Sequence, residues 1–214
     1  MRTETTTKTI YKFDELSEEV KEKANNLRLR NGDSNPWSDE HRESLKQFSD
    51  LFPVTIVGWQ YDSCSGWINI KLNEDSLQEG VSDLEGLRLR TWIMNNYGHV
   101  LYAKKTKFYT KNKDGERQMN SVGGTTFTYT SKIQEERSSC PFTGYCGDES
   151  LLDPIHKFIA NPTPGTTLED LMQECGNSWI AEGVSDEENF QSLEWFADHA
   201  EANEYEFDED GNIH

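Results

Sequence analysis

Residues 166–203 read TTLEDLMQECGNSWIAEGVSDEENFQSLEWFADHAEAN, and apolar side chains recur through them at three- and four-residue spacing. This period is typical of amphipathic α-helices, and TTLED supplies the polar and acidic residues that begin one. One apolar stripe comprises Leu168, Leu171, Met172, Cys175, Trp179 and Ile180, and a second comprises Phe190, Leu193, Phe196 and Ala197. The pattern predicts two helices, at 166–182 and 186–203, which bury these stripes and turn acidic faces outward.

Four further helices are predicted from capping and stop signals. Ser17 is expected to cap the first, Pro53 to end the second and Gly98 to stop the third. The predicted helices cover residues 18–30, 38–52, 82–98 and 149–160.

Two pairs of strands are predicted where the apolar period shortens to two. The first pair joins 54–63 to 66–73 through a tight turn. The second joins 99–110 to 125–134 through a 14-residue polar connection, with its tip expected at Asp114-Gly115. This order predicts an α+β fold: a small antiparallel sheet of two hairpins flanked by helices, with an acidic helical C-terminal third.

Charge divides the chain near residue 147. Residues 1–147 carry 20 Lys and Arg against 21 Asp and Glu, whereas residues 148–214 carry 18 Asp and Glu against a single basic residue, Lys157. We expect an α+β core domain at 1–147 with the acidic helical region 148–214 packed on it, or one domain overall. A field of this sign disfavours nucleic acid and anionic membranes as ligands of the C-terminal third and attracts basic surfaces.

The C-terminal helices therefore carry the main candidate for a protein-binding surface. Carboxylates at fixed helical spacing can occupy a basic groove that serves DNA or RNA, and counterion release makes such binding strong and salt-sensitive. Trp195, Tyr205 and Phe207 could add aromatic anchors. The alternative is a solvated helical face and a frayed tail. The partner-binding candidates are Glu182, Asp186, Glu187, Glu188, Glu194, Asp198, Glu201 and Glu204.

A local basic cluster lies on the second predicted hairpin. Lysines interleaved with aromatic residues can follow a phosphate backbone or stack on bases, so this cluster is a weaker candidate for nucleic-acid contact. It could instead neutralise the acidic third. Its residues are Lys104, Lys105, Lys107, Phe108, Tyr109, Lys111 and Lys113.

Cysteine and histidine offer a third, less favoured kind of site. Cys140 and Cys146 are spaced more widely than the usual zinc-binding pair, so a loop with buried thiols is preferred to a metal site completed by His156. A hydrolase or nuclease using Cys146 with His156 or His99 stays open as an alternative. The sequence contains no Walker loop, GxGxxG, HExxH or GxSxG motif. We assign no catalytic residue, no metal ligand and no cofactor.

Four stretches carry a resemblance to a known family: TIYKFDELSEEVKEKA at 9–24, SSCPFTGYCGDESLLDPI at 138–155, TLEDLMQECGNSW at 167–179 and EANEYEFDEDGN at 201–212. The chain resembles uncharacterised acidic proteins encoded by phages and prophages of Gram-positive bacteria, sometimes labelled antitoxin-like. NNLRLRNG at 25–32 departs from the Trp- or Tyr-containing continuation of many members.

The resemblance implies a counter-defence protein that inhibits a nucleic-acid-handling immune effector of the host, with a CRISPR nuclease such as Cas9 as the leading expectation. In that setting the basic hairpin could touch guide RNA. An antitoxin-like or regulatory protein-binding role is the alternative. The N-terminus lacks an apolar segment, and no uncharged run approaches the ~18 residues of a spanning helix. We therefore expect a soluble protein of the bacterial cytoplasm with free thiols.

Overall fold

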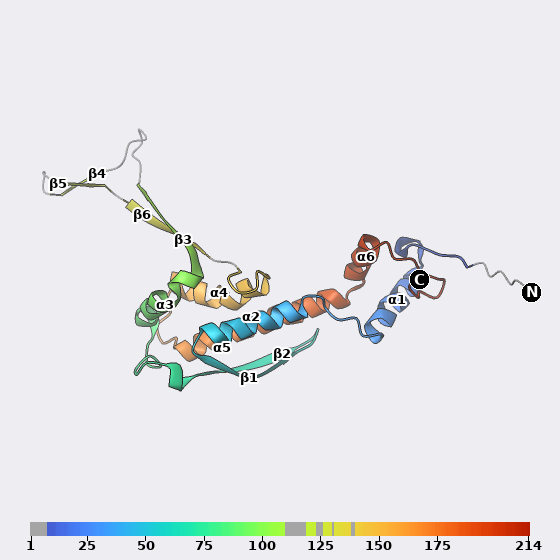
Figure 1. Ribbon diagram of the computed structural model, residues 1–214, viewed down its shortest axis with the longest axis horizontal. Helices are drawn as coiled ribbons and strands as arrows, with labels where there is room; N and C mark the ends of the chain where they lie inside the picture. Colours follow the sequence, from blue (N-terminus) through green and yellow to red (C-terminus); the bar gives the residue numbers. More distant parts are fainter. Residues whose placement is uncertain (1–7, 110–118, 123–125, 130, 138–139) are drawn as a thin grey trace, which may run out of the picture.

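The computed structural model describes residues 8–109, 119–122, 126–129, 131–137 and 140–214. The fold is α+β, as predicted, and the described part of the chain is elongated (Figure 1). Helix α5 (Leu168–Gln191) runs along the long axis and connects the two ends of the molecule. Its first stripe is confirmed as core, because Leu168, Leu171, Met172, Cys175, Trp179 and Ile180 are all buried.

The predicted break between 182 and 186 is wrong, because α5 continues to Gln191. Gly183 does not stop the helix; it lies where a Cβ atom would come within 2.7 Å of the His41 ring, so only glycine fits beneath that ring. The helix ends instead at Ser192, whose hydroxyl accepts a hydrogen bond from the Trp195 amide and caps α6 (Leu193–Ala202). At the other end, Thr167 and Asp170 form the capping box that begins α5.

The N-terminal helices follow the prediction closely. Helix α1 spans Glu18–Arg30 and α2 spans Ser38–Leu51. Helix α3 (Gly86–Leu101) begins four residues later than predicted and continues past the expected stop at Gly98, a glycine that is buried inside the helix next to Met94. Helix α4 (Gly147–Ala160) packs against α5, on the side opposite the strands formed by residues 54–72 (Figure 1).

The first strand pair is confirmed: β1 (Val54–Tyr61) and β2 (Gly66–Leu72) are antiparallel, with a bulge between Ile56 and Gly58. Ile68 and Ile70 alternate inward and contact α5. Gln173 of α5 then covers the free edge of β2: its side-chain oxygen accepts from the Ile70 amide at 3.1 Å, and its nitrogen donates to the Ile68 carbonyl at 3.0 Å. Gln173 therefore occupies the edge of β2 at these two positions, where a further strand would otherwise pair.

The second strand pair is confirmed in part, because residues 102–109 pair antiparallel with residues 131–137. Strand β3 (Tyr102–Tyr109) pairs with β6 (Ser131–Arg137), and β4 (Met119–Val122) pairs with β5 (Thr126–Tyr129). Among the described residues these are separate two-stranded pairs, so the expectation of one sheet made of two hairpins is wrong. Residues 99–101 belong to α3, and the expected tip at Asp114-Gly115 lies outside the described residues.

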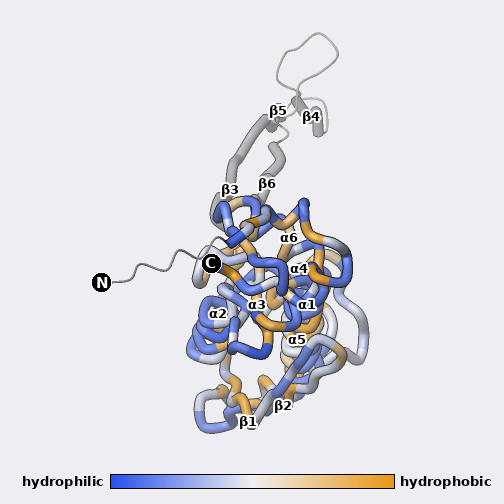
Figure 2. The backbone as a smooth tube through the Cα atoms, turned by 90° about the vertical axis from the view of Figure 1, so that its right-hand side faces the viewer, coloured by the Kyte–Doolittle hydropathy of each residue, from blue (hydrophilic) through white to orange (hydrophobic). Residues whose placement is uncertain are grey.

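The buried apolar side chains form two clusters. The larger joins α2, β1, β2, α3, α4 and α5 around Trp179 and Phe48. Figure 2 shows β1 and β2 below the helices, with hydrophobic (orange) and hydrophilic (blue) stretches along both layers. The smaller cluster joins the two chain ends and consists of Phe13, Leu16, Ala24, Phe196, Ala200 and Phe207. Each cluster uses residues from both sides of position 147, and the domain division at that position stays a prediction.

Candidate partner-binding site

The predicted carboxylates of α6 lie on one helix face. Glu194, Asp198 and Glu201 follow an i, i+4, i+7 spacing, which places them within one narrow stripe of an α-helix. All three are exposed, whereas Phe196 and Ala200 on the opposite side are buried. The packed side of α6 therefore fixes the direction of its acidic side.

Contacts between the two chain ends hold α6 in place. The backbones of Tyr11 and Phe207 exchange two hydrogen bonds of 2.9 Å, and Lys23 pairs with Asp210 at 2.9 Å. The ring of Phe13, in the short helical turn Phe13–Glu15, packs edge-on against Phe196 with 5.1 Å between centroids. The acidic tail after α6 is thus folded back on the N-terminal segment.

Arg28 of α1 orients α6 relative to α5. Its guanidinium lies 4.5–5.0 Å from the ring centroids of Phe190, Trp195 and Phe196, and it donates to the Phe190 carbonyl. The neighbouring Asn25 donates to the Gln191 carbonyl at 2.9 Å. These carbonyls end α5 and have no partner within the helix, so two side chains of α1 cap its C-terminus.

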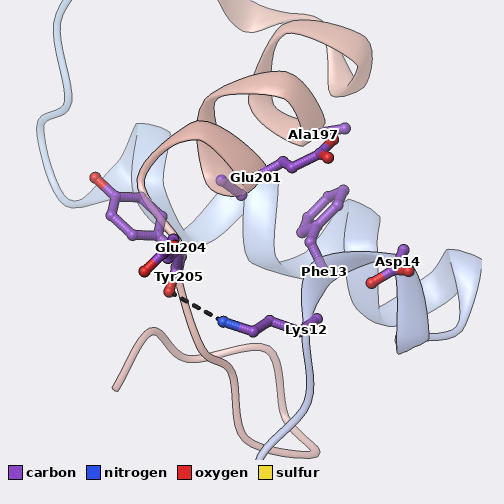
Figure 3. A pocket seen from close by; sticks show the side chains of 8 residues that line it. Lys12, Phe13, Asp14, Ala197, Glu201, Glu204 and Tyr205 are labelled. Atoms are coloured by element: carbon purple, nitrogen blue, oxygen red, sulfur yellow. Dashed lines mark hydrogen bonds between the residues drawn. The ribbon is translucent and has the colours of Figure 1, made fainter.

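A pocket of about 380 Å³ lies between α6 and the N-terminal segment. Figure 3 shows that the side chains around it come from both chain ends. Phe13, Ala197, Ala200 and Tyr205 supply apolar surface, and Asp14, Glu201 and Glu204 supply exposed carboxylates. Its lining also includes Lys12, whose Nζ donates to the Glu204 carbonyl at 3.4 Å.

Glu204 is held in an unusual backbone conformation beside this pocket. Its φ of 53° is left-handed, and it is the one such non-glycine residue among those the structure describes. The turn follows α6 directly, with the Asn203 amide bonded to the His199 carbonyl and the Tyr205 amide to that of Ala200. The strained turn brings Tyr205 and the Glu204 carbonyl to the pocket.

The predicted carboxylates of α5 do not share a face with those of α6. Glu182 accepts a hydrogen bond from Ser150 at 3.0 Å, and Asp186 accepts one from the Tyr145 hydroxyl. Glu187 is half-buried, and burial raises the pKa of its carboxyl. Glu188 is exposed, and its position two residues after Asp186 places it on nearly the opposite side of α5. The eight candidates therefore divide into Glu194, Asp198 and Glu201 on α6, Glu204 in the turn after it, and four residues of α5, of which Glu182 and Asp186 are bonded to other side chains.

A buried polar cluster, not anticipated from the sequence, lies within electrostatic range of two of the α5 carboxylates, Asp186 and Glu187. His41 of α2 stacks on Trp179 and shares a hydrogen bond of 3.0 Å between Nδ1 and the Tyr61 hydroxyl. Burial lowers the pKa of His41 to about 4, and burial followed by the charge of Glu187 raises the pKa of Tyr61 to about 12. Such groups stay neutral at pH 7 and serve packing.

Cys146 and His156, the residues of the suggested hydrolase, are not brought together. Cys146 precedes α4 and is exposed, whereas His156 lies ten residues further on, about 15 Å along the helix axis. His156 is buried, with Nε2 at 3.2 Å from the Leu101 carbonyl, and burial lowers its pKa. Among the described residues, no three acidic, cysteine or histidine side chains gather as metal ligands.

Only part of the basic cluster can be placed. The backbones of Lys104, Lys105, Lys107, Phe108 and Tyr109 form β3, opposite β6. Lys111 and Lys113 lie outside the described residues. The suggested contact with nucleic acid or guide RNA stays a prediction.

The pocket residues Phe13 and Asp14 were not predicted, because they lie about 180 positions before α6 and no periodic signal links them to it. None of the helices in the described ranges has the length and apolar character needed to cross a bilayer.

Searches with this chain against protein-family models, curated proteins and solved structures gave no match.

Proposed function

We propose that the protein binds a basic groove of a nucleic-acid-handling defence protein of the bacterial cell and inhibits it by occupying that groove. The observation that carries the proposal is the exposed α6 stripe of Glu194, Asp198 and Glu201, held in one direction by the packed face of the same helix. The phage-protein resemblance favours a CRISPR nuclease such as Cas9 as the target.

The spacing of these charges suits such a groove. Helical rise separates Glu194 from Asp198 by about 6 Å along the axis and Asp198 from Glu201 by about 4.5 Å. Phosphates along one DNA strand are about 3.4 Å apart along the duplex axis, so both arrays present negative charges a few ångströms apart. When the lysines and arginines of the target pair with either array, the counterions held near these charges are released into solution. Binding should therefore weaken as the salt concentration rises.

Order is what separates this surface from a merely acidic tail. A flexible carboxylate loses conformational freedom when it is bound, and that loss subtracts from the affinity. On α6 the helix, the Ser192 cap and the contacts with Phe13 have already fixed the backbone. The three carboxylates therefore reach a partner with little further ordering of the main chain.

The test is affinity capture from a bacterial lysate at low and high salt, together with inhibition of purified Cas9 by the full chain. The triple variant Glu194→Gln, Asp198→Asn, Glu201→Gln should lose at least tenfold in affinity. Its matched control, Glu79→Gln, Asp83→Asn, Glu174→Gln, removes the same charge from exposed positions outside the candidate set and should bind as the parent does. Equal losses in both triples would reduce the effect to net charge and end the proposal. Capture of a toxin would favour the antitoxin-like role instead.

A further inference from the structure

The pocket beside α6 combines two kinds of surface in one small volume. Phe13 is 7% exposed and Ala200 2% exposed, so these two side chains belong to its interior, together with Ala197 and Tyr205. Asp14, Glu201 and Glu204 are exposed carboxylates around this apolar interior (Figure 3). At about 380 Å³ the pocket falls in the ordinary size range of ligand sites, about 300–1,000 Å³.

This arrangement is complementary to a cation on an apolar stem. The stem would lie against Phe13 and Ala200, and the charged head would meet carboxylates at the rim. Arginine fits such surroundings better than lysine, because its planar guanidinium is more weakly hydrated, stacks on aromatic rings and pairs with carboxylates in a bidentate manner.

The chain already places a cation of its own at this rim. Lys12 Nζ lies 3.4 Å from the Glu204 carbonyl oxygen and 3.8 Å from Glu206 Oε1, and its side chain is 52% exposed. Contacts this long and this exposed are weak. Lys12 therefore shows that the rim attracts positive charge, and it is held loosely enough to move aside.

We propose that this pocket receives an arginine side chain from the target protein, with Lys12 as its intramolecular competitor. The inference rests on the proposed function, because it names the partner group that reaches the acidic surface. The arginine would enter between α6 and the N-terminal segment, form its ion pairs with Glu201 and Glu204, and displace the Lys12 ammonium from the Glu204 carbonyl.

The first test uses a defined probe and the full chain. Nα-acetyl-arginine-methylamide is titrated into ¹⁵N-labelled protein, and its uncharged isostere, Nα-acetyl-citrulline-methylamide, is the control. We expect saturable amide shifts at Ala200, Glu201 and Tyr205 with the arginine compound only. Glu201→Gln with Glu204→Gln should weaken binding at least fivefold, Lys12→Met should strengthen it about twofold, and Glu174→Gln, at an exposed position away from the pocket, should change nothing. Equal shifts with arginine and citrulline would overturn the inference.

A second test separates the pocket from the acidic stripe. Ala197→Leu fills the pocket and leaves every carboxylate in place, and a thermal melt shows whether the variant is folded. We expect folded Ala197→Leu to bind the target at least about fivefold more weakly. If it binds as the parent does while the α6 triple variant fails, the arginine inference falls and the proposed function stands. If neither variant changes target binding, the proposed function and the target arginine both fall, whether or not the free arginine probe binds.

Discussion

Trp179 and His41 contact each other in two ways at once. Their rings stack with 4.2 Å between centroids and 8° between planes, and the Trp179 indole nitrogen donates to the main-chain carbonyl of His41 at 2.9 Å. Both residues are almost completely buried. The pair therefore ties α2 to α5 in the larger core, independently of the surface that we propose to bind a partner.

Replacing the indole should destabilise the whole protein. Trp179→Phe removes the hydrogen bond to His41 and leaves a cavity, and we expect a loss of about 2–3 kcal/mol in the free energy of unfolding. Urea titration followed by circular dichroism measures it. Trp37→Phe is the control, because Trp37 is 54% exposed and should cost less than about 0.5 kcal/mol. Equal effects would contradict the role assigned to Trp179.

His41 should make stability depend on pH. Its pKa is lowered to about 4 by burial, against about 6.5 when unfolded, so between these values the unfolded chain binds the extra proton. Stability should fall as pH drops from about 7 to 4, with up to about 3 kcal/mol from this residue. The difference between the parent and His41→Gln, measured by denaturant titration at each pH, isolates that part. A parallel pH dependence in both proteins would show that His41 does not titrate as described.

Local signals predicted most helices but could not show where a helix continues. Ser185 followed by three acidic residues has the composition of a helix start, yet the same residues are compatible with a helix interior. The helix continues where Gly183 packs beneath His41 and Tyr61, which lie 142 and 122 positions earlier in the chain. The pocket beside α6 has the same origin, since its walls come from both chain ends and neither wall carries a pattern that names the other.

Arg28 should stabilise the smaller cluster, in which α1 and α6 pack together. Its guanidinium contacts three aromatic rings and caps α5 at Phe190, so Arg28→Met should cost about 2–3 kcal/mol. Hydrogen exchange of the α6 amides should accelerate more than that of β1 and β2, which belong to the other core. Arg30→Met, at an exposed position of the same helix, is the control and should leave exchange unchanged. Uniform acceleration throughout the chain would contradict a local role.

Asp148 should determine how well the loop before α4 protects Cys140. The buried carboxylate accepts hydrogen bonds from the amides of Phe142 and Thr143, each at 2.9 Å, and from the Ser44 hydroxyl. Asn at this position replaces an acceptor oxygen with a donor, so Asp148→Asn should loosen the loop at a cost of about 1–3 kcal/mol. Burial and the Asp148 charge both raise the pKa of the half-buried Cys140 thiol, and the variant weakens both effects. Alkylation followed by mass spectrometry should therefore show faster labelling of Cys140, while exposed Cys64 reacts at its former rate and serves as the internal standard. Unchanged labelling of Cys140 in a variant of normal stability would mean that the loop keeps its shape without the carboxylate.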